Sequence, residues 1–229
     1  MTLILAAKLE NKNGSYIILG ADGKGTLRYG GTTMKTKNEE KMFLFNDFVS
    51  VLISGDGEIG CELILRFKEK YSSLLKKNVS IIAEKFSEFC RTEYKKFGLY
   101  TPATAETFPS VSFIIAGLEK ISRGKFSPKI FILRSESSFI NCRKPKYCVD
   151  GAPIIAEYLM IKGYSDELQI DEACKLIGQI LYETSQVDST VGGKLKIAFI
   201  DRDGFNYDDE SIKSIVPWDV EELLKAIKD

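Results

Sequence analysis

The sequence predicts an α+β fold built as a four-layer αββα sandwich, in which two antiparallel sheets pack together and a pair of helices flanks each sheet. The predicted elements run strands, two helices, strands, two helices, strand and helix, an order that lacks the strand–helix alternation of a doubly wound parallel sheet. Apolar residues make up 44% and charged residues 28% of the 229 positions, as in ordinary globular domains. No linker-like segment or shift in composition divides the chain, so we expect a single domain over residues 1–229.

Two β-hairpins open the predicted order. Short apolar runs indicate strands at residues 3–7, 16–19, 42–45 and 48–53. Turn-forming residues at 11–14 join the first two strands, and residues 46–47 join the other two. A polar, glycine-rich stretch at residues 23–40 separates the hairpins.

Helical periodicity comes next. Apolar residues recur at helical spacing in two consecutive segments, Ile59, Leu63, Phe67, Tyr71 and Leu74 in the first, and Ile82, Phe86, Phe89, Cys90, Tyr94 and Phe97 in the second. The spacing predicts two long helices placed back to back. Ser80 is the expected N-cap of the second helix, and residues 99–109, which include Pro102, are expected to form a loop.

The second half repeats this order of elements. Strands are predicted at residues 111–116, 129–133, 139–142 and 147–149, helices at 152–163 and 168–181, a strand at 195–200 and a last helix at 219–228. Two segments resemble ligand loops only in part. Residues 20–26 do not match the spacing of a phosphate-binding loop, and residues 201–206, which lack the ligand series of a calcium loop, are interpreted as a turn after a strand.

The composition excludes several classes of function. The chain has no histidine, which removes Ser-His-Asp and Cys-His catalysis and His-ligated metal sites. Its 32 basic and 32 acidic residues balance, which argues against a nucleic acid or an anionic membrane as partner. The five cysteines show no Cys-x-x-Cys spacing and are interpreted as reduced intracellular thiols. With no signal peptide and no membrane-spanning stretch in the sequence, we expect a cytoplasmic protein.

Thr2 offers a way to catalyse a reaction without histidine. A small residue directly after Met1 allows the initiator methionine to be removed, which would leave a threonine with a free α-amine at the start of a buried strand. An α-amine has a pKa of about 7.7–8.0, so it acts as a base near neutral pH. Nucleophile and base then belong to one residue.

The residues that follow Thr2 strengthen this interpretation by their order. Leu19-Gly20-Ala21-Asp22-Gly23-Lys24-Gly25-Thr26 ends the second strand, Glu40-Lys41-Met42-Phe43-Leu44 opens the third, and Ile53-Ser54-Gly55-Asp56 precedes the first helix; Val149-Asp150-Gly151 and Asp188-Ser189-Thr190-Val191-Gly192-Gly193 come far downstream. From Thr2 to about Ile200 this order resembles the proteasome family of N-terminal-nucleophile hydrolases. The resemblance implies the same four-layer sandwich.

The resemblance also implies a catalytic set. Thr2 matches the N-terminal nucleophile, and Asp22 matches the aspartate that pairs with a catalytic lysine, here Lys41. Gly55 matches the glycine whose backbone N–H forms the oxyanion hole, and Asp188 matches an aspartate that helps to orient the N-terminal group. A buried Lys41 would favour the Thr2 alkoxide, and Asp22 would compensate its charge.

Four further positions carry expectations from the same resemblance. Thr26 matches a residue whose backbone pairs with extended substrate, and Ile53 a residue that lines the first specificity pocket. Asp150 and Val191 stand where family peptidases usually carry serines of the network around the amine. Asp150 could replace its serine as a charged partner, whereas Val191 cannot donate or accept a hydrogen bond, so water or Asp188 must replace that hydroxyl.

The implied activity is that of a threonine peptidase of the proteasome β type, acting on peptides or unfolded proteins without a cofactor or metal. The changed network leaves two alternatives open: a proteasome-like peptide ligase that passes the acyl group to an amine, and a catalytically silent assembly subunit. Family members usually form rings, so a homo-oligomer is expected, with an ATPase as a possible partner.

Overall fold

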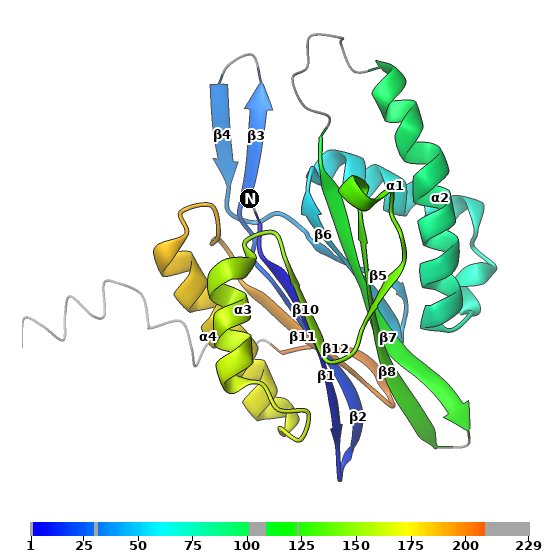
Figure 1. Cartoon of the computed structure of the whole chain (residues 1–229), viewed down its shortest axis with the longest axis vertical. Helices are drawn as coiled ribbons and strands as arrows, with labels where there is room; N and C mark the ends of the chain where they lie inside the picture. Colours follow the sequence, from blue (N-terminus) through cyan, green and yellow to red (C-terminus); the bar gives the residue numbers. More distant parts are fainter. Residues whose placement is uncertain (1, 30–31, 101–108, 123, 209–229) are drawn as a thin grey trace, which may run out of the picture.

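The computed structural model describes residues 2–29, 32–100, 109–122 and 124–208. This part of the chain forms two five-stranded antiparallel sheets, a separate two-stranded hairpin and four α-helices (Figure 1). The expected α+β class with two antiparallel sheets is therefore confirmed. Among the described residues, no helix is both long and apolar enough to cross a membrane.

The first sheet contains the start of the chain. Its strands lie in the order β10-β1-β2-β11-β12, with bounds Tyr147–Asp150, Ile4–Asn11, Gly14–Ala21, Lys196–Asp201 and Gly204–Tyr207. The central pair β1 and β2 is in register from Ile4 opposite Ala21 to Asn11 opposite Gly14. Its near-continuous apolar sequence reflects burial on both faces, because Leu3 and Leu5 pack against helices while Ile4 packs toward the other sheet.

The second sheet has the strand order β5-β6-β7-β8-β9, with bounds Met42–Asn46, Val49–Gly55, Val111–Ser122, Lys125–Arg134 and Cys142–Lys144. Its inner face meets the first sheet through an apolar layer that includes Ile4, Leu19, Leu52, Ile114 and Ile132. The two sheets thus share one buried interface.

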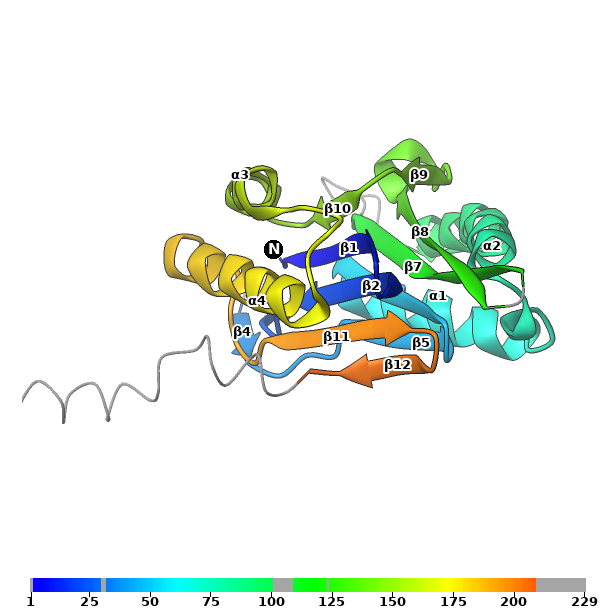
Figure 2. The same cartoon turned by 90° about the horizontal axis from the view of Figure 1, so that it is seen from below.

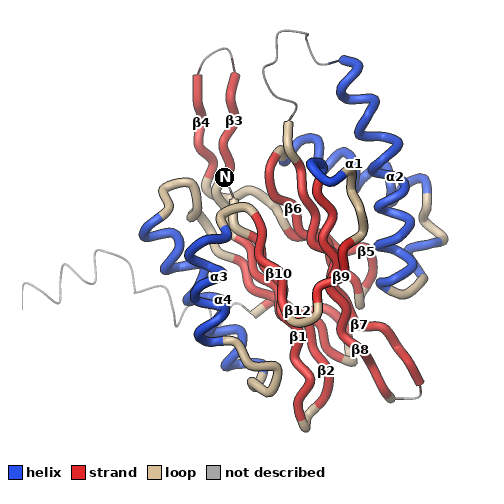
Figure 3. The backbone as a smooth tube through the Cα atoms, in the orientation of Figure 1, coloured by secondary structure: helices blue, strands red, loops and turns tan. Residues whose placement is uncertain are grey.

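A helix pair covers the outer face of each sheet (Figures 2 and 3). Helices α1 (Gly57–Lys70) and α2 (Val79–Tyr100) pack on the second sheet around a cluster of aromatic rings, Phe45, Phe67, Phe86, Phe89 and Phe113. Helices α3 (Pro153–Gly163) and α4 (Ile170–Val187) pack on the first sheet over Leu5, Ile18 and Ile197. The described layers therefore run helices, sheet, sheet, helices.

Two expected details of the helices differ in the structure. Asn78, not Ser80, caps α2, because its side-chain Oδ1 accepts a hydrogen bond from Ile81 N–H at 3.0 Å. The Ser80 hydroxyl instead donates to Glu119 at 2.8 Å. The first helix ends at Lys70, and Leu74 belongs to a short 3-10 turn, Leu74–Lys76. The expected loop at 99–109 begins late, since α2 runs to Tyr100; residues 101–108 and the expected helix at 219–228 lie outside the described residues.

Three strand expectations also need correction. The stretch 23–40, whose glycine and polar residues gave no strand signal, contains a hairpin of β3 (Gly25–Tyr29) and β4 (Thr32–Thr36). The strand predicted at 139–142 is misplaced, because only Cys142 of it is paired and β9 runs Cys142–Lys144. A 3-10 turn, Ser135–Ser137, lies before it, and Phe139 has a φ of +53° and is buried in the aromatic cluster, so its apolar character reflects packing and not pairing. Residues 201–204 form the expected turn, and the short strand β12, which the sequence did not predict, follows it.

Candidate active site at one end of the two sheets

Thr2 lies just before β1 and is 7% exposed. The backbone of the next residue, Leu3, is held by two hydrogen bonds with Asp22. Leu3 N–H donates to Asp22 Oδ1 at 2.9 Å, and Asp22 N–H donates to Leu3 O at 3.0 Å. Thr2 is therefore fixed at the end of the first sheet from which β3 and β4 project (Figure 1).

Lys41 and Asp22 form a buried ion pair beside this peptide. Lys41 Nζ lies 2.7 Å from Asp22 Oδ1, and their side chains are 5% and 0% exposed. Nζ also donates to the carbonyl oxygen of Lys24 at 2.6 Å. Burial lowers the pKa of Lys41, while the negative charge of Asp22 and its hydrogen bond act in the opposite direction. The ammonium thus points into the protein and not into bulk solvent.

One carboxylate oxygen of Asp22 joins the start of the first sheet to the lysine. Asp22 Oδ1 accepts from both Lys41 Nζ and Leu3 N–H, so the ammonium and the peptide after Thr2 share an acceptor. The other oxygen, Oδ2, accepts from Gly192 N–H at 3.0 Å and Lys24 N–H at 3.3 Å. This network pairs Asp22 with Lys41 and joins both to the backbone of Leu3, the residue after Thr2.

Gly55 ends β6 at the point where the chain turns into α1. Its φ of +87° is in the left-handed region, and a Cβ atom there would lie 2.3 Å from Ser110 O, so only glycine fits. Asp56 follows as the N-cap of α1, with its side chain accepting from Ile59 N–H at 3.0 Å. Gly55 is exposed.

Asp150 lies at the end of β10 and faces the second sheet. Its Oδ1 accepts a hydrogen bond from Arg134 Nε at 2.8 Å and lies 2.7 Å from Arg134 Nη2 in the same ion pair, and its Oδ2 accepts from the Ser54 hydroxyl. The next residue, Gly151, packs against the carbonyl of Thr2. Ser54 and Arg134 did not stand out in the sequence, because nothing local marks partners that are 96 and 16 positions away from Asp150.

Asp188 bonds within its own turn. Its Oδ1 accepts from Thr190 N–H at 2.8 Å and from the Thr190 hydroxyl at 2.6 Å, and these hydrogen bonds lower the pKa of Asp188. The turn reaches the site through Gly192, which bonds with both Asp22 and Gly23. The described hydrogen bonds of the Asp188 carboxylate thus go to Thr190.

Val191 and Ile53 contribute to the core. Val191 is 2% exposed and belongs to the apolar cluster under α3 and α4. Ile53 is also 2% exposed and faces α1, where a Cβ atom at Gly60 would lie 2.5 Å from its Cγ2. Its side chain is packed in the aromatic cluster, not placed around the Asp22–Lys41 pair. Thr26 lies on β3 with its backbone opposite Lys35.

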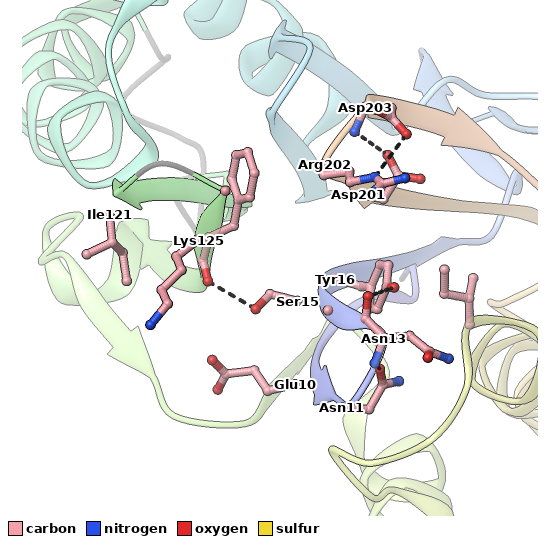
Figure 4. Close-up of a pocket in the computed structure, with 14 residues that line it drawn as sticks. Glu10, Asn11, Asn13, Ser15, Tyr16, Ile121, Lys125, Asp201, Arg202 and Asp203 are labelled. Carbon is pink, nitrogen blue, oxygen red and sulfur yellow. Dashed lines mark hydrogen bonds and ion pairs between the residues drawn. The ribbon is translucent and has the colours of Figure 1, made fainter.

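A separate cleft of about 680 Å³ lies at the other end of the sheets (Figure 4). The turns of three hairpins form it, through residues that include Asn13, Lys125 and Arg202. None of the residues around Thr2 lines it. No group of three or more His, Cys, Asp or Glu side chains that could hold a metal ion occurs in the described part of the chain.

The end of the sheets at Thr2 thus combines a buried hydroxyl residue, a buried cation paired with a carboxylate, and a glycine in the left-handed region. No protein-family model matches the chain.

Proposed function

We propose that the chain is a threonine-type peptidase of the proteasome β type, an N-terminal-nucleophile hydrolase that becomes active when Met1 is removed. The single observation that carries the proposal is the shared oxygen of Asp22, which ties the buried Lys41 ammonium to the peptide after Thr2. The helices–sheet–sheet–helices layering supports the four-layer sandwich of that superfamily.

In the proposed reaction, the Thr2 hydroxyl oxygen attacks the carbonyl carbon of a peptide bond and its proton passes to the Thr2 α-amine. Gly55 N–H donates to the resulting oxyanion, which is worth roughly 3 kcal/mol for one such donor. The tetrahedral intermediate collapses to an acyl ester on Thr2, and the leaving amine takes the proton from the α-ammonium. Water then attacks the ester while the α-amine accepts its proton; the ester C–O bond breaks, the proton returns to the Thr2 oxygen, and the free acid leaves.

Lys41 makes this proton transfer feasible at neutral pH. In this proposal the positive charge of Lys41 favours the Thr2 alkoxide and the neutral form of the α-amine. Positioned proton transfer of this kind contributes roughly 10²–10⁴-fold to a rate. Asp22 keeps the buried charge compensated, and the site needs neither histidine nor metal.

The wider assignment follows from the same resemblance. Peptides or unfolded proteins are the proposed substrates, a homo-oligomeric ring the proposed assembly, and an ATPase a possible partner. The described cysteines, all free thiols, support a cytoplasmic location.

Intact-mass measurement before and after exposure to a peptide epoxyketone tests the proposal. We expect a mass that lacks Met1 and a single adduct that maps to Thr2. Thr2→Ala should abolish the adduct, while Thr92→Ala, at an exposed position of α2, should leave it unchanged. Retention of Met1, or no adduct on the processed protein, would overturn the proposal and favour a silent assembly subunit.

A competing amine separates hydrolysis from ligation. With a peptide substrate in the presence of a second peptide amine, a peptidase gives mainly the free acid. Predominant formation of the joined peptide would identify the ligase alternative, which uses the same acyl ester.

A further inference from the structure

The proposed active site is divided between the two sheets. Thr2 precedes β1 in the first sheet, whereas Gly55 ends β6 in the second. An acyl transfer requires the attacking oxygen and the oxyanion donor at a fixed separation, and an error of about 1 Å can cost roughly 10²-fold in rate. The two sheet ends therefore need a connection close to the site.

Asp150 makes such a connection through side chains from two strands of the opposite sheet. Its Oδ2 accepts from the Ser54 hydroxyl on β6, and its Oδ1 accepts a hydrogen bond from Arg134 Nε and forms an ion pair with Arg134 Nη2 at the end of β8. Asp150 is 7% and Ser54 4% exposed, so the carboxylate bonds where little water competes. We call these three residues the intersheet bridge.

Both ends of the bridge lie next to the proposed catalytic groups. Ser54 is the residue before Gly55, and Asp150 is the residue before Gly151. Gly151 has a φ of +96°, and a Cβ atom on it would lie 1.9 Å from Thr2 O, so its backbone lies in tight contact with Thr2. Any shift of Asp150 is transmitted to Thr2, and any shift of Ser54 to Gly55.

The pairing of β10 with β1 explains why the carboxylate points across to the second sheet. Asp150 lies opposite Ile4 in the register, and the Ile4 side chain belongs to the apolar layer between the sheets. Cross-strand neighbours share a face of a sheet. The Asp22–Lys41 pair uses different residues, so the bridge is a second, independent constraint on the site.

We propose that Ser54, Asp150 and Arg134 are positioning residues that set the separation between the Thr2 nucleophile and the Gly55 oxyanion donor. This inference rests on the proposed function. It assigns Asp150 a role different from that of a simple replacement for a serine near the α-amine, because its two oxygens are already bound by residues of the opposite sheet.

The test compares two reactions of Thr2. Acylation by a β-lactone needs both the hydroxyl and the oxyanion donor, whereas reductive methylation of the Thr2 α-amine needs only an accessible amine. In Asp150→Ala and Arg134→Gln we expect acylation, followed by intact mass, to slow 10- to 100-fold, with methylation of Thr2 unchanged in peptide mapping. Ser54→Ala should slow acylation in the same direction, and Ser54→Thr, which keeps a hydroxyl, should restore much of the rate.

Arg202→Gln is the matched control, because Arg202 is an exposed arginine beside Asp203 at the far end of the sheets. It should acylate at the parental rate. The Ser54→Ala and Asp150→Ala changes combined should cost little more than Asp150→Ala alone, since both break one connection. If circular dichroism shows that Asp150→Ala does not fold, the acylation rates of Ser54→Ala and Arg134→Gln test the inference instead.

Parental acylation rates in the folded bridge variants would overturn the inference, as would equal slowing of acylation and methylation, which would indicate general loss of structure. Failure of the proposed function looks different, because the parent protein itself would then not be acylated at Thr2.

Discussion

At the scale of single residues, the Lys41–Asp22 pair serves both stability and the proposed chemistry. Lys41→Met would leave the Asp22 carboxylate buried without a countercharge, and breaking a buried pair in this way typically costs about 3–5 kcal/mol. We expect this loss in the free energy of unfolding, measured by urea denaturation, together with loss of the Thr2 adduct.

A double variant separates the two roles of this pair. Asp22→Asn combined with Lys41→Met removes the unpaired charge but keeps an amide oxygen for Leu3 N–H. Most of the stability should return while the adduct remains absent. Full adduct formation in either variant would contradict a catalytic part for Lys41.

Lys8 gives a prediction about pH. It is 5% exposed, its Nζ donates to Pro145 O at 2.9 Å, and burial lowers its pKa to about 8. In the unfolded chain the pKa is about 10.4, so between these values the unfolded state binds more protons and the contribution of Lys8 to stability rises with pH. Lys8→Met should therefore be more stable than the parent at pH 7, and this advantage should shrink between pH 8 and pH 10.

Urea denaturation of both proteins across this range checks the prediction. The buried cysteines also titrate there on unfolding, but they are common to both proteins and cancel in the difference. An advantage of Lys8→Met that stays constant from pH 7 to pH 10 would show that the Lys8 amine keeps its ordinary pKa.

The sequence could predict some of these residues but not their partners. The pairing of Asp22 with Lys41 followed from the family resemblance and stands in the structure at 2.7 Å. The contacts of Ser54 and Arg134 with Asp150 depend on how the two sheets pack face to face. Local sequence patterns do not contain that information. The sequence prediction for Val191 concerned only the hydroxyl that is missing at this position. In the structure its apolar side chain packs in the core.

At the scale of elements, apolar periodicity located most of the strands and helices whose faces are buried. The β3–β4 hairpin lies in a stretch whose glycine, threonine and charged residues interrupt that periodicity, so the pairing of Gly25–Tyr29 with Thr32–Thr36 was not apparent from the sequence. The segment at Phe139 shows the reverse error, because a buried side chain in a turn resembles a residue of a strand.

The start of α2 provides a matched pair of variants at this scale. Asn78 caps the helix through Ile81 N–H, so Asn78→Ala should lower the free energy of unfolding by about 1 kcal/mol. Ser80→Ala removes only the bond to the side chain of Glu119 and should cost less. Thermal or urea denaturation of the two variants measures both losses in the free energy of unfolding. A larger loss for Ser80→Ala than for Asn78→Ala would show that Ser80 is the N-cap of α2.

At the scale of the whole molecule, the layer between the sheets is the part that both halves share. Ile114 on β7 is fully buried there, opposite Leu52 on β6 and Ile132 on β8. Ile114→Ala should cost about 2–5 kcal/mol, because it removes buried methyl groups and leaves a cavity. Ile121→Ala on the same strand, where the side chain is 68% exposed, is the control and should change stability little.

The way in which the protein unfolds tests whether the two sheets form one domain. The site draws Thr2 and Asp22 from the first sheet and Gly55 from the second, so it exists only while both are folded and packed together. In Ile114→Ala, loss of circular dichroism and loss of Thr2 acylation should therefore coincide in a single transition at a lower urea concentration than in the parent. If acylation is lost well before the circular dichroism signal, the sheets separate before they unfold, and the chain behaves as two cooperative units joined at the site.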